Sequence, residues 1–400
     1  MSVKTFPLVA AIFAVLVCSG VAASQQRATI RFNPQRPLQA NPETSREQDD
    51  FLRMLDENDP TRRNRLLDDL LSDYPTSEFT HMFLQSRWEI RLGRDDPQDI
   101  IDTALEGLDA YDYFMERKLG FIDEPTSPPD YPTEQYRLAS QQLQYHQSII
   151  QAATDLAQIE QVAQHTELGL AAAENADEWY GQLGEDADEI AGMDSEAFAE
   201  LSLNARMFML NNMRSIYQES ENTSGVIEIG ERMLEVIPED VELLLNTSAL
   251  MVQEIPEDPT ARTELMERAR DYSDRAVDGI DLFLLRSDLT DEQQAGVRAE
   301  LYGTMGLASI QLGDWGTAIA AYRAATNATP GAPNMHYMLG LAGANAQDID
   351  VALPAFARAH YLAPEIAEVR TTLEQLYEAK EGTLDGLEAY IQSEGTALGF

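Results

Sequence analysis

A spacing of 34 residues near the C-terminus constrains the fold more than any other feature of this sequence. Five residues recur in the same order and without a gap: a glycine, an alanine, an aromatic residue, a second alanine and a proline. The first copy is Gly306, Ala318, Tyr322, Ala325 and Pro330, and the second is Gly340, Ala352, Phe356, Ala359 and Pro364. Self-similarity at a fixed period of about 20–50 residues indicates a small structural unit that stacks on copies of itself.

Each residue type in the period suits one place in a pair of antiparallel helices. Gly306 and Ala318 leave room for two helices to cross closely, and Tyr322 fills the gap to the next pair. Pro330 cannot continue a helix and therefore ends the period. The Gly313-Asp314-Trp315 segment is suited to the turn between the two helices, so one period predicts one helical hairpin.

The two periods resemble the tetratricopeptide repeat, and the clear resemblance covers about 299–366. The family pattern places an apolar residue before the glycine, a position that Met305 and Leu339 fill here. The second copy departs at the turn, where it has Gln347-Asp348-Ile349. The resemblance implies an all-α fold, a right-handed superhelical solenoid of antiparallel helix pairs.

The rest of the chain has a helical pattern from about residue 46, and its helical segments are separated by short, often proline-containing loops. We interpret 46–120 as helical hairpins, with degenerate repeats as an alternative, and 138–298 as degenerate helical repeats. The segment 121–137 holds four prolines and is the expected internal break. Residues 367–400 are expected to form capping helices that shield the last repeat.

The N-terminus is typical of an export signal. Lys4 precedes an apolar stretch from Phe6 to Val17, and Val21-Ala22-Ala23 supplies the small residues of a cleavage site. We therefore expect a signal peptide over 1–23, a flexible tail over 24–45, and an exported protein, periplasmic or secreted if the source is a bacterium. Membrane association would require an uncleaved signal or lipidation of Cys18.

Cys18 is the only cysteine, so cleavage would leave a chain without thiols or disulfides. Val17 precedes it, where a lipoprotein signal would have a small residue, so lipidation is the minor alternative.

The formal net charge is −41, which would repel nucleic-acid phosphates and anionic membrane surfaces. We therefore expect a protein or peptide partner and no nucleic acid. The segment 24–45 is locally basic, with Arg27, Arg31 and Arg36 and no acid before Glu43. It is interpreted as a solvated tail, with docking on an acidic surface as the alternative.

Motifs that carry catalysis or cofactor binding are absent from the sequence. The five histidines have no paired-ligand spacing, and no nucleophile-elbow, dinucleotide or phosphate-loop motif occurs. The acidic segment 184–196 lacks the ligand spacing and the glycine of a calcium loop. The sequence predicts no catalytic residue, no cofactor and no metal site, and a protein that is not an enzyme.

The resemblance implies a peptide-binding groove on the concave face, formed mainly by the first helix of each repeat. The family's carboxylate clamp is missing, because Gly303 and Leu307 stand at its positions. An alternative stays open, in which Leu307 and Leu341 pack against an adjacent helix. The residues expected to line the groove are Leu307, Ile310, Gln311, Asn334, Tyr337, Leu341 and Asn345.

These observations favour an exported, non-enzymatic interaction scaffold or adaptor that holds a partner peptide or helix in the groove. One alternative is an enzyme with a catalytic helical region in 46–290 and a C-terminal docking module. The other is a self-associating component of an envelope assembly.

Overall fold

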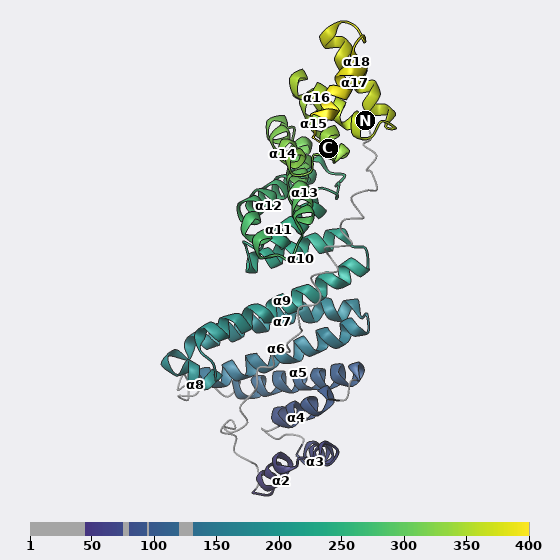
Figure 1. Cartoon of the computed structure of the whole chain (residues 1–400). Coiled ribbons are helices and arrows are strands. Elements are labelled where there is room, and N and C mark those ends of the chain that lie inside the picture. Colours follow the sequence, from purple (N-terminus) through teal and green to yellow (C-terminus); the bar gives the residue numbers. More distant parts are fainter. Residues whose placement is uncertain (1–44, 75–79, 94–95, 120–130, 400) are drawn as a thin grey trace. The chain divides into compact units, whose positions relative to one another are not determined.

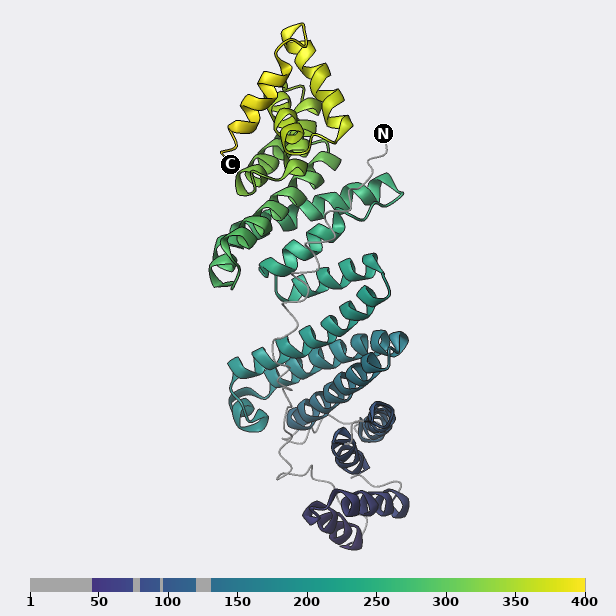
Figure 2. The ribbon, with the colours of Figure 1, turned by 45° about the vertical axis from the view of Figure 1, so that its right-hand side comes forward.

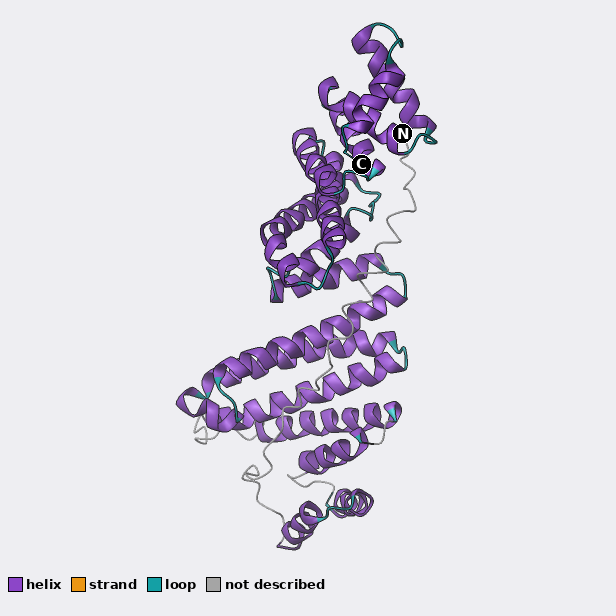
Figure 3. Ribbon diagram, viewed as in Figure 1, coloured by secondary structure: helices purple, strands orange, loops and turns teal. Residues whose placement is uncertain are grey.

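A computed structural model describes residues 45–399 except 75–79, 94–95 and 120–130. Every regular element of the described residues is a helix (Figure 3). The expected signal peptide, nearly all of the expected N-terminal tail and most of the expected break over 121–137 lie outside the described residues. No helix among those described is both long enough and apolar enough to span a bilayer.

The first half of the chain forms eight α-helices and one short 3-10 helix in the described residues. They are α2 (Ser45–Asp56), α3 (Pro60–Asp73), α4 (Thr80–Leu92), α5 (Pro97–Leu119), α6 (Tyr131–Asp155), α7 (Ile159–Gln182), η1 (Gly184–Asp186), α8 (Ala187–Ala191) and α9 (Ser195–Glu219).

The second half continues with nine further helices in the described residues, which include those of the predicted repeats (Figure 1). They are α10 (Thr223–Val236), α11 (Val241–Met251), α12 (Pro259–Arg286), α13 (Asp291–Gln311), α14 (Trp315–Ala328), α15 (Pro333–Asn345), α16 (Ile349–Leu362), α17 (Ala367–Glu381) and α18 (Leu387–Thr396).

The chain divides into two compact units. The first unit comprises residues up to 156 together with 167–205, and the second comprises 157–166 together with 206–400. Helices α7 and α9 contribute residues to both units.

Two boundaries differ from the sequence-based expectation. Helix α6 begins at Tyr131, so the last residues of the expected proline-rich break are helical. Pro132 is its second residue, where a missing N–H costs nothing because that group has no partner within the helix. Within the region interpreted as degenerate repeats, α6 and α7 are separate helices because Ala157 turns the chain with a φ of 53°.

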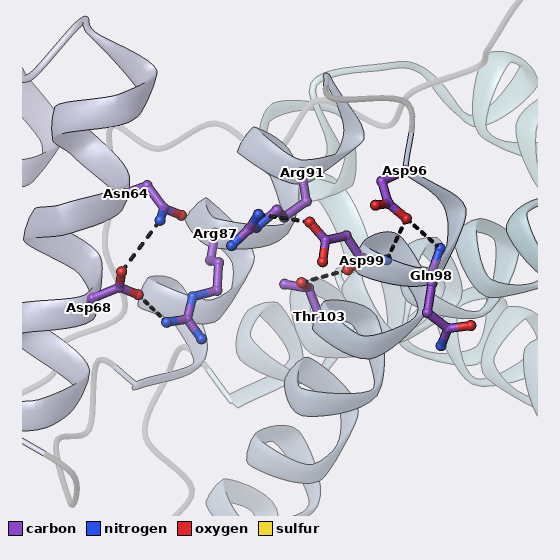
Figure 4. Close-up of polar contacts among 8 residues, drawn as sticks. All are labelled: Asn64, Asp68, Arg87, Arg91, Asp96, Gln98, Asp99 and Thr103. Carbon is purple, nitrogen blue, oxygen red and sulfur yellow. Dashed lines mark hydrogen bonds and ion pairs between the residues drawn. The ribbon is translucent and has the colours of Figure 1, made fainter.

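In the first unit, α4 is tied to both of its neighbours by arginines (Figure 4). Arg87 of α4 forms an ion pair with Asp68 of α3, and its Nη1 lies 3.0 Å from Glu106 Oε2 of α5. Arg91 Nη1 lies 2.8 Å from Asp99 Oδ2, also on α5. These partly exposed pairs link three successive helices and are each expected to contribute about 0.2–1 kcal/mol.

In the second unit, α13 pairs with α14 and α15 pairs with α16, which confirms two consecutive helical hairpins over the predicted repeats. A Cβ added to Gly306 would lie 2.6 Å from the Tyr322 ring, and one added to Gly340 would lie 2.9 Å from the Phe356 ring. Each glycine therefore allows an aromatic ring to pack against the backbone of the partner helix.

The aromatic residues also reach the following hairpin. Tyr322 belongs to an apolar cluster with Leu339 of α15 and Val351 of α16. Phe356 belongs to the next cluster, with Val369 and Leu373 of α17. The apolar core therefore continues from one hairpin to the next, as expected of a stacked repeat.

Aspartates cap the second helix of each hairpin. Asp314 Oδ1 accepts a hydrogen bond of 3.1 Å from the Thr317 backbone N–H at the start of α14. Asp348 Oδ1 does the same for Val351 at the start of α16, at 3.2 Å. Both caps satisfy backbone donors that a helix N-terminus leaves without partners.

The two C-terminal helices both pack against α16. Figure 2 shows α17 and α18, in yellow, diverging from the turn that joins them. Leu373 of α17 and the α18 residues Leu387 and Ile391 are buried in the same cluster as Phe356. One apolar side of the last hairpin is therefore covered by these two helices, and their assignment as caps stays a prediction.

Candidate binding surface

The first helices of the predicted repeats lie next to each other. Met335 of α15 lies against Gly303 of α13, where an added Cβ would be 3.0 Å from its Cε. On the other side of α15, Tyr337 and Leu341 pack against the cluster that contains Val369 and Leu373 of α17. Helix α15 is therefore flanked by α13 and α17.

The predicted groove residues on α15 are arranged along one stretch of this helix. Tyr337 and Leu341 are partly buried, whereas Asn334 and Asn345 are exposed. The Asn345 side-chain amide donates a hydrogen bond of 2.8 Å to the Leu341 carbonyl oxygen. This stretch presents one aromatic residue, one aliphatic residue and two amides.

Packing holds the Tyr337 ring in one orientation. Its centroid is 5.8 Å from that of Phe356, and the two rings are inclined at 69°, an edge-to-face contact. Burial raises the pKa of the Tyr337 phenol, and the nearby Glu368 carboxylate of α17 raises it further. The phenol therefore stays protonated at neutral pH and can donate a hydrogen bond.

The predicted groove residues on α13 have different environments. Leu307 packs against an apolar cluster with Met251 of α11 and Leu265 of α12. Ile310 packs against the cluster around Tyr322, between the two hairpins. Gln311 is exposed at the last position of α13.

The two apolar residues of α13 therefore contribute to the packing between helices, and Gln311 is the predicted residue of α13 that solvent reaches most freely. The assignment of all seven residues to a binding groove stays a prediction.

The sequence reasoning missed one neighbour of these residues, Glu368. It lies at the start of α17, which was expected to be only a cap, yet its carboxylate acts on Tyr337. The signal that identifies it is the 34-residue period itself, because 300, 334 and 368 are successive equivalent positions. These positions hold Glu300, Asn334 and Glu368.

Glu300 lies one turn before Thr304 on α13 and is partly buried. Burial raises the pKa of its carboxyl group. Its carboxylate forms no hydrogen bond or ion pair with any residue that the structure describes.

A hollow of about 450 Å³ lies elsewhere in the second unit, against α12. Its lining comes from Glu264, Glu267, Arg268 and Asp271, all on that one helix. A catalytic pocket is expected to bring together polar groups from several elements, and this hollow does not. In the described part of the chain, no three histidine, cysteine, aspartate or glutamate side chains converge as a metal site requires.

Comparisons with known proteins add little to this description. No protein-family model matches the sequence, and no curated protein matches it. Solved structures of helical-repeat proteins align with most of the chain at low similarity. One is the Cut9–Hcn1 hetero-tetramer of the APC/C, with a TM-score of 0.32 and 13% identity, over 83% of this chain and 64% of that chain.

Two further structures align at a similar level. Yeast Tom70 has a TM-score of 0.32 and 12% identity, over 90% of this chain and 70% of that one. The human IFIT1 dimer with PPP-AAAA has a TM-score of 0.32 and 10% identity, over 90% and 94% of the two chains. Similarities this low carry no argument about partners. The fold class, an all-α stack of antiparallel helix pairs, follows from the described helices themselves.

Proposed function

We propose that this protein is a non-enzymatic interaction scaffold that binds a segment of a partner protein on the surface of α13 and α15. We call this the α13–α15 surface and define it by Gln311, Asn334, Tyr337, Leu341 and Asn345. The observation that carries the proposal is the arrangement on α15, where two partly buried apolar side chains lie among exposed amides. Apolar anchors with hydrogen-bonding groups around them are typical of surfaces that recognise a helix or an extended peptide.

Site-specific photo-crosslinking in the source cell tests this proposal. A photoreactive amino acid at Asn345 would lie on the α13–α15 surface, and the same substitution at Asn327 would lie on the exposed side of α14. Both positions are exposed asparagines, so neither change disturbs the core. We expect one partner to be captured from position 345 and not from 327. Equal capture at both positions, or none at either, contradicts the proposed surface.

Substitution of residues on the α13–α15 surface gives a second test, in which capture of the partner is compared between variants. Tyr337→Ala removes the ring that packs on Phe356, so its effect on folding must be measured separately from its effect on binding. Asn334→Ala leaves the apolar packing intact because Asn334 is exposed. We expect capture to weaken in both variants and to weaken more in Tyr337→Ala.

We also propose that the protein is exported, on the strength of the apolar segment between Phe6 and Val17 and the small residues before Ser24. Cell fractionation and N-terminal sequencing of the mature chain test this. The expected N-terminus is Ser24, in a periplasmic or secreted fraction. A chain that keeps Met1 and stays with the cytosol contradicts the proposal.

The two alternative functions predict different outcomes of simple measurements. A self-associating envelope component would form oligomers that grow with concentration without an added partner, which sedimentation detects. An enzyme with its catalytic region in 46–290 would lose activity through substitutions there and keep it when Asn345 is changed.

A further inference from the structure

The α13–α15 surface lies in a part of the chain that is almost without cations. Residues 299–357 contain one lysine or arginine, Arg323, on α14. Helix α15 has no aspartate, glutamate, lysine or arginine at all, in a chain in which 24% of the residues are charged. The centre of the surface is therefore uncharged.

Carboxylates flank this uncharged centre on the two neighbouring helices. Glu300 on α13, Asn334 on α15 and Glu368 on α17 occupy equivalent positions in successive 34-residue periods. Met335 of α15 meets Gly303 of α13, whereas Tyr337 of α15 lies near Glu368 of α17. Residues 335 and 337 are about 200° apart around a helix, so α13 and α17, which carry the two carboxylates, lie on opposite sides of α15. Glu368 is close enough to Tyr337 to affect the pKa of its phenol.

Neither flanking carboxylate forms an ion pair within the described part of the second unit. Nearby cations are already engaged. Arg370 lies 2.6 Å from Glu374 and 2.7 Å from Glu388, and Lys380 lies 2.7 Å from Asp350. Arg298, which precedes Glu300 by two residues, lies 2.6 Å from Asp281. Glu300 and Glu368 are thus carboxylates without a cationic partner among the described residues.

The apolar centre and the flanking carboxylates together specify a kind of ligand. A partner segment with an apolar side chain can cover Tyr337 and Leu341. Lysine or arginine on either side of it can then reach Glu300 and Glu368. The Tyr337 ring also suits a cation, since the face of a phenol attracts ammonium and guanidinium groups. An acidic segment or a nucleic acid would bring like charge to the same carboxylates.

We propose that the α13–α15 surface binds a cationic segment of a partner protein, with an apolar anchor on Tyr337 and Leu341 and basic side chains at Glu300 and Glu368. This inference rests on the proposed function and names the chemistry of its partner.

Binding of short synthetic peptides to the full mature chain, followed by fluorescence anisotropy, tests the inference. One probe alternates leucine with lysine, and its matched partners carry glutamine or glutamate in place of lysine. We expect the lysine probe to bind most tightly, and its affinity to fall as salt is raised. We expect the glutamate probe not to bind.

Paired variants separate a specific site from general attraction to an acidic protein. Glu300→Gln with Glu368→Gln removes the two flanking carboxylates, and Glu264→Gln with Glu267→Gln removes two exposed carboxylates from α12. Two partly exposed ion pairs at about 0.5–1 kcal/mol each correspond to roughly a tenfold loss of affinity in the first variant. The control variant should lose less than about twofold. Equal losses in both variants overturn the proposal.

The outcome can be distinguished from failure of the proposed function. Photo-crosslinking from Asn345 reports whether a partner occupies the surface at all, whatever its charge. Capture of a partner together with equal binding of the lysine and glutamate probes would overturn the cationic partner and leave the scaffold function standing. The same titration with a chain that lacks residues 24–44 tests another occupant. A clear gain in affinity there would assign the surface to the chain's own basic segment and overturn the partner proposal.

Discussion

Both units of this protein contain a glycine packed under an aromatic ring of the next helix, but the number of residues between the glycine and the ring differs. In the first unit, a Cβ added to Gly107 of α5 would lie 2.5 Å from the Tyr145 ring of α6. In the second unit, Gly306 and Tyr322 form the equivalent contact at 2.6 Å. Gly306 and Tyr322 are 16 residues apart, as are Gly340 and Phe356, whereas Gly107 and Tyr145 are 38 apart.

The difference comes from the distance of each contact from the turn between its helices. In both hairpins the glycine lies five residues before the end of its helix, at Gln311 or Asn345, and the next helix begins four residues later, so the contact recurs at a constant interval. Helices α5 and α6 have 23 and 25 residues and are joined by a longer connection. A glycine under an aromatic ring is thus a packing solution available to any helical hairpin, and it becomes a visible sequence repeat only where the glycine and the ring keep a constant distance from the turn.

Removal of an aromatic ring at a hairpin contact should have the largest effect on stability. Phe356 is fully buried and contacts α15, α17 and α18 through its cluster. Phe356→Ala should lower the free energy of unfolding by about 3–5 kcal/mol, because it leaves a cavity between three helices. Urea denaturation followed by circular dichroism measures this loss.

The first unit provides the control for that variant. Hydrogen exchange should show faster exchange in α15–α18 and unchanged exchange in α4–α6, since the lost contacts all lie in the second unit. A loss below about 1 kcal/mol would contradict the role given to this ring.

Addition of a methyl group at the glycine contacts should have the next largest effect. Gly306→Ala and Gly107→Ala each force a Cβ against a ring and should each destabilise by about 1–3 kcal/mol. Gly181→Ala is the matched control, because nothing lies within 4 Å of a Cβ there. It should be neutral or stabilise by up to about 1 kcal/mol, as alanine favours a helix over glycine. Equal effects at all three positions would show that the ring contacts do not constrain packing.

Loss of an N-terminal cap should have a moderate effect. Asp314→Ala leaves the first N–H groups of α14 without their acceptor and should cost about 1 kcal/mol. Asp314→Asn should keep most of the cap, because an amide oxygen also accepts this hydrogen bond. Thermal denaturation of both variants checks the difference.

The same residue gives a pH-dependent signature. Hydrogen bonds from the Thr317 backbone N–H and hydroxyl lower the pKa of the Asp314 carboxyl in the folded state. Its contribution to stability is therefore present above the ordinary aspartate pKa of about 3.9 and is lost as pH falls through the lowered value. The Asn variant should lack this loss. Identical acid unfolding of the wild type and the Asn variant would contradict it.

Neutralisation of single carboxylates should have the smallest effect on stability, and the sign of the effect should differ between the two units. Glu106→Gln removes a partner of Arg87 and should cost about 0.2–1 kcal/mol. Glu300→Gln removes a partly buried carboxylate that has no described partner and should stabilise by about 0.5 kcal/mol at neutral pH.

The pH dependence of Glu300 sharpens this contrast. Burial raises the pKa of its carboxyl in the folded state, so the wild type should lose stability as pH rises from the ordinary glutamate pKa of about 4.3 through the raised value. The Gln variant should lack this slope. The free energy of unfolding of the wild type and the Gln variant should be measured across this pH interval. A steeper slope in the variant would contradict the raised pKa of Glu300.

The fold of residues 299–366 could be predicted because every part of the signal is local. The glycine, the small residues and the proline each act within one hairpin. The contact of Gly306 with the Tyr322 ring was not predicted, because the sequence reasoning assigned that ring to the gap before the next pair. Upstream, the sequence indicated helices but not their division. Ala157 gives no sign in the sequence that it will adopt a positive φ and end the run between α6 and α7.

The candidate surface could be predicted only in part. The family register assigned Asn334, Tyr337, Leu341 and Asn345 to the first helix of one repeat, and all four lie on α15. It could not show that Leu307 would pack against residues of α11 and α12, since that contact joins segments more than 40 residues apart. It also omitted Glu368, because α17 was treated as a cap and not as a continuation of the period.

By itself, the sequence determined the helical class, the 34-residue hairpin and the acidic charge, since these depend on residue type and spacing along one or two helices. Tertiary structure decided which side chains of α13 and α15 are used in packing and which stay exposed. Burial is a property of three or more helices brought together, and a pattern read along one helix carries no information about the third. For the same reason, Glu300 and Glu368 became a pair of flanking carboxylates only once α15 lay between them.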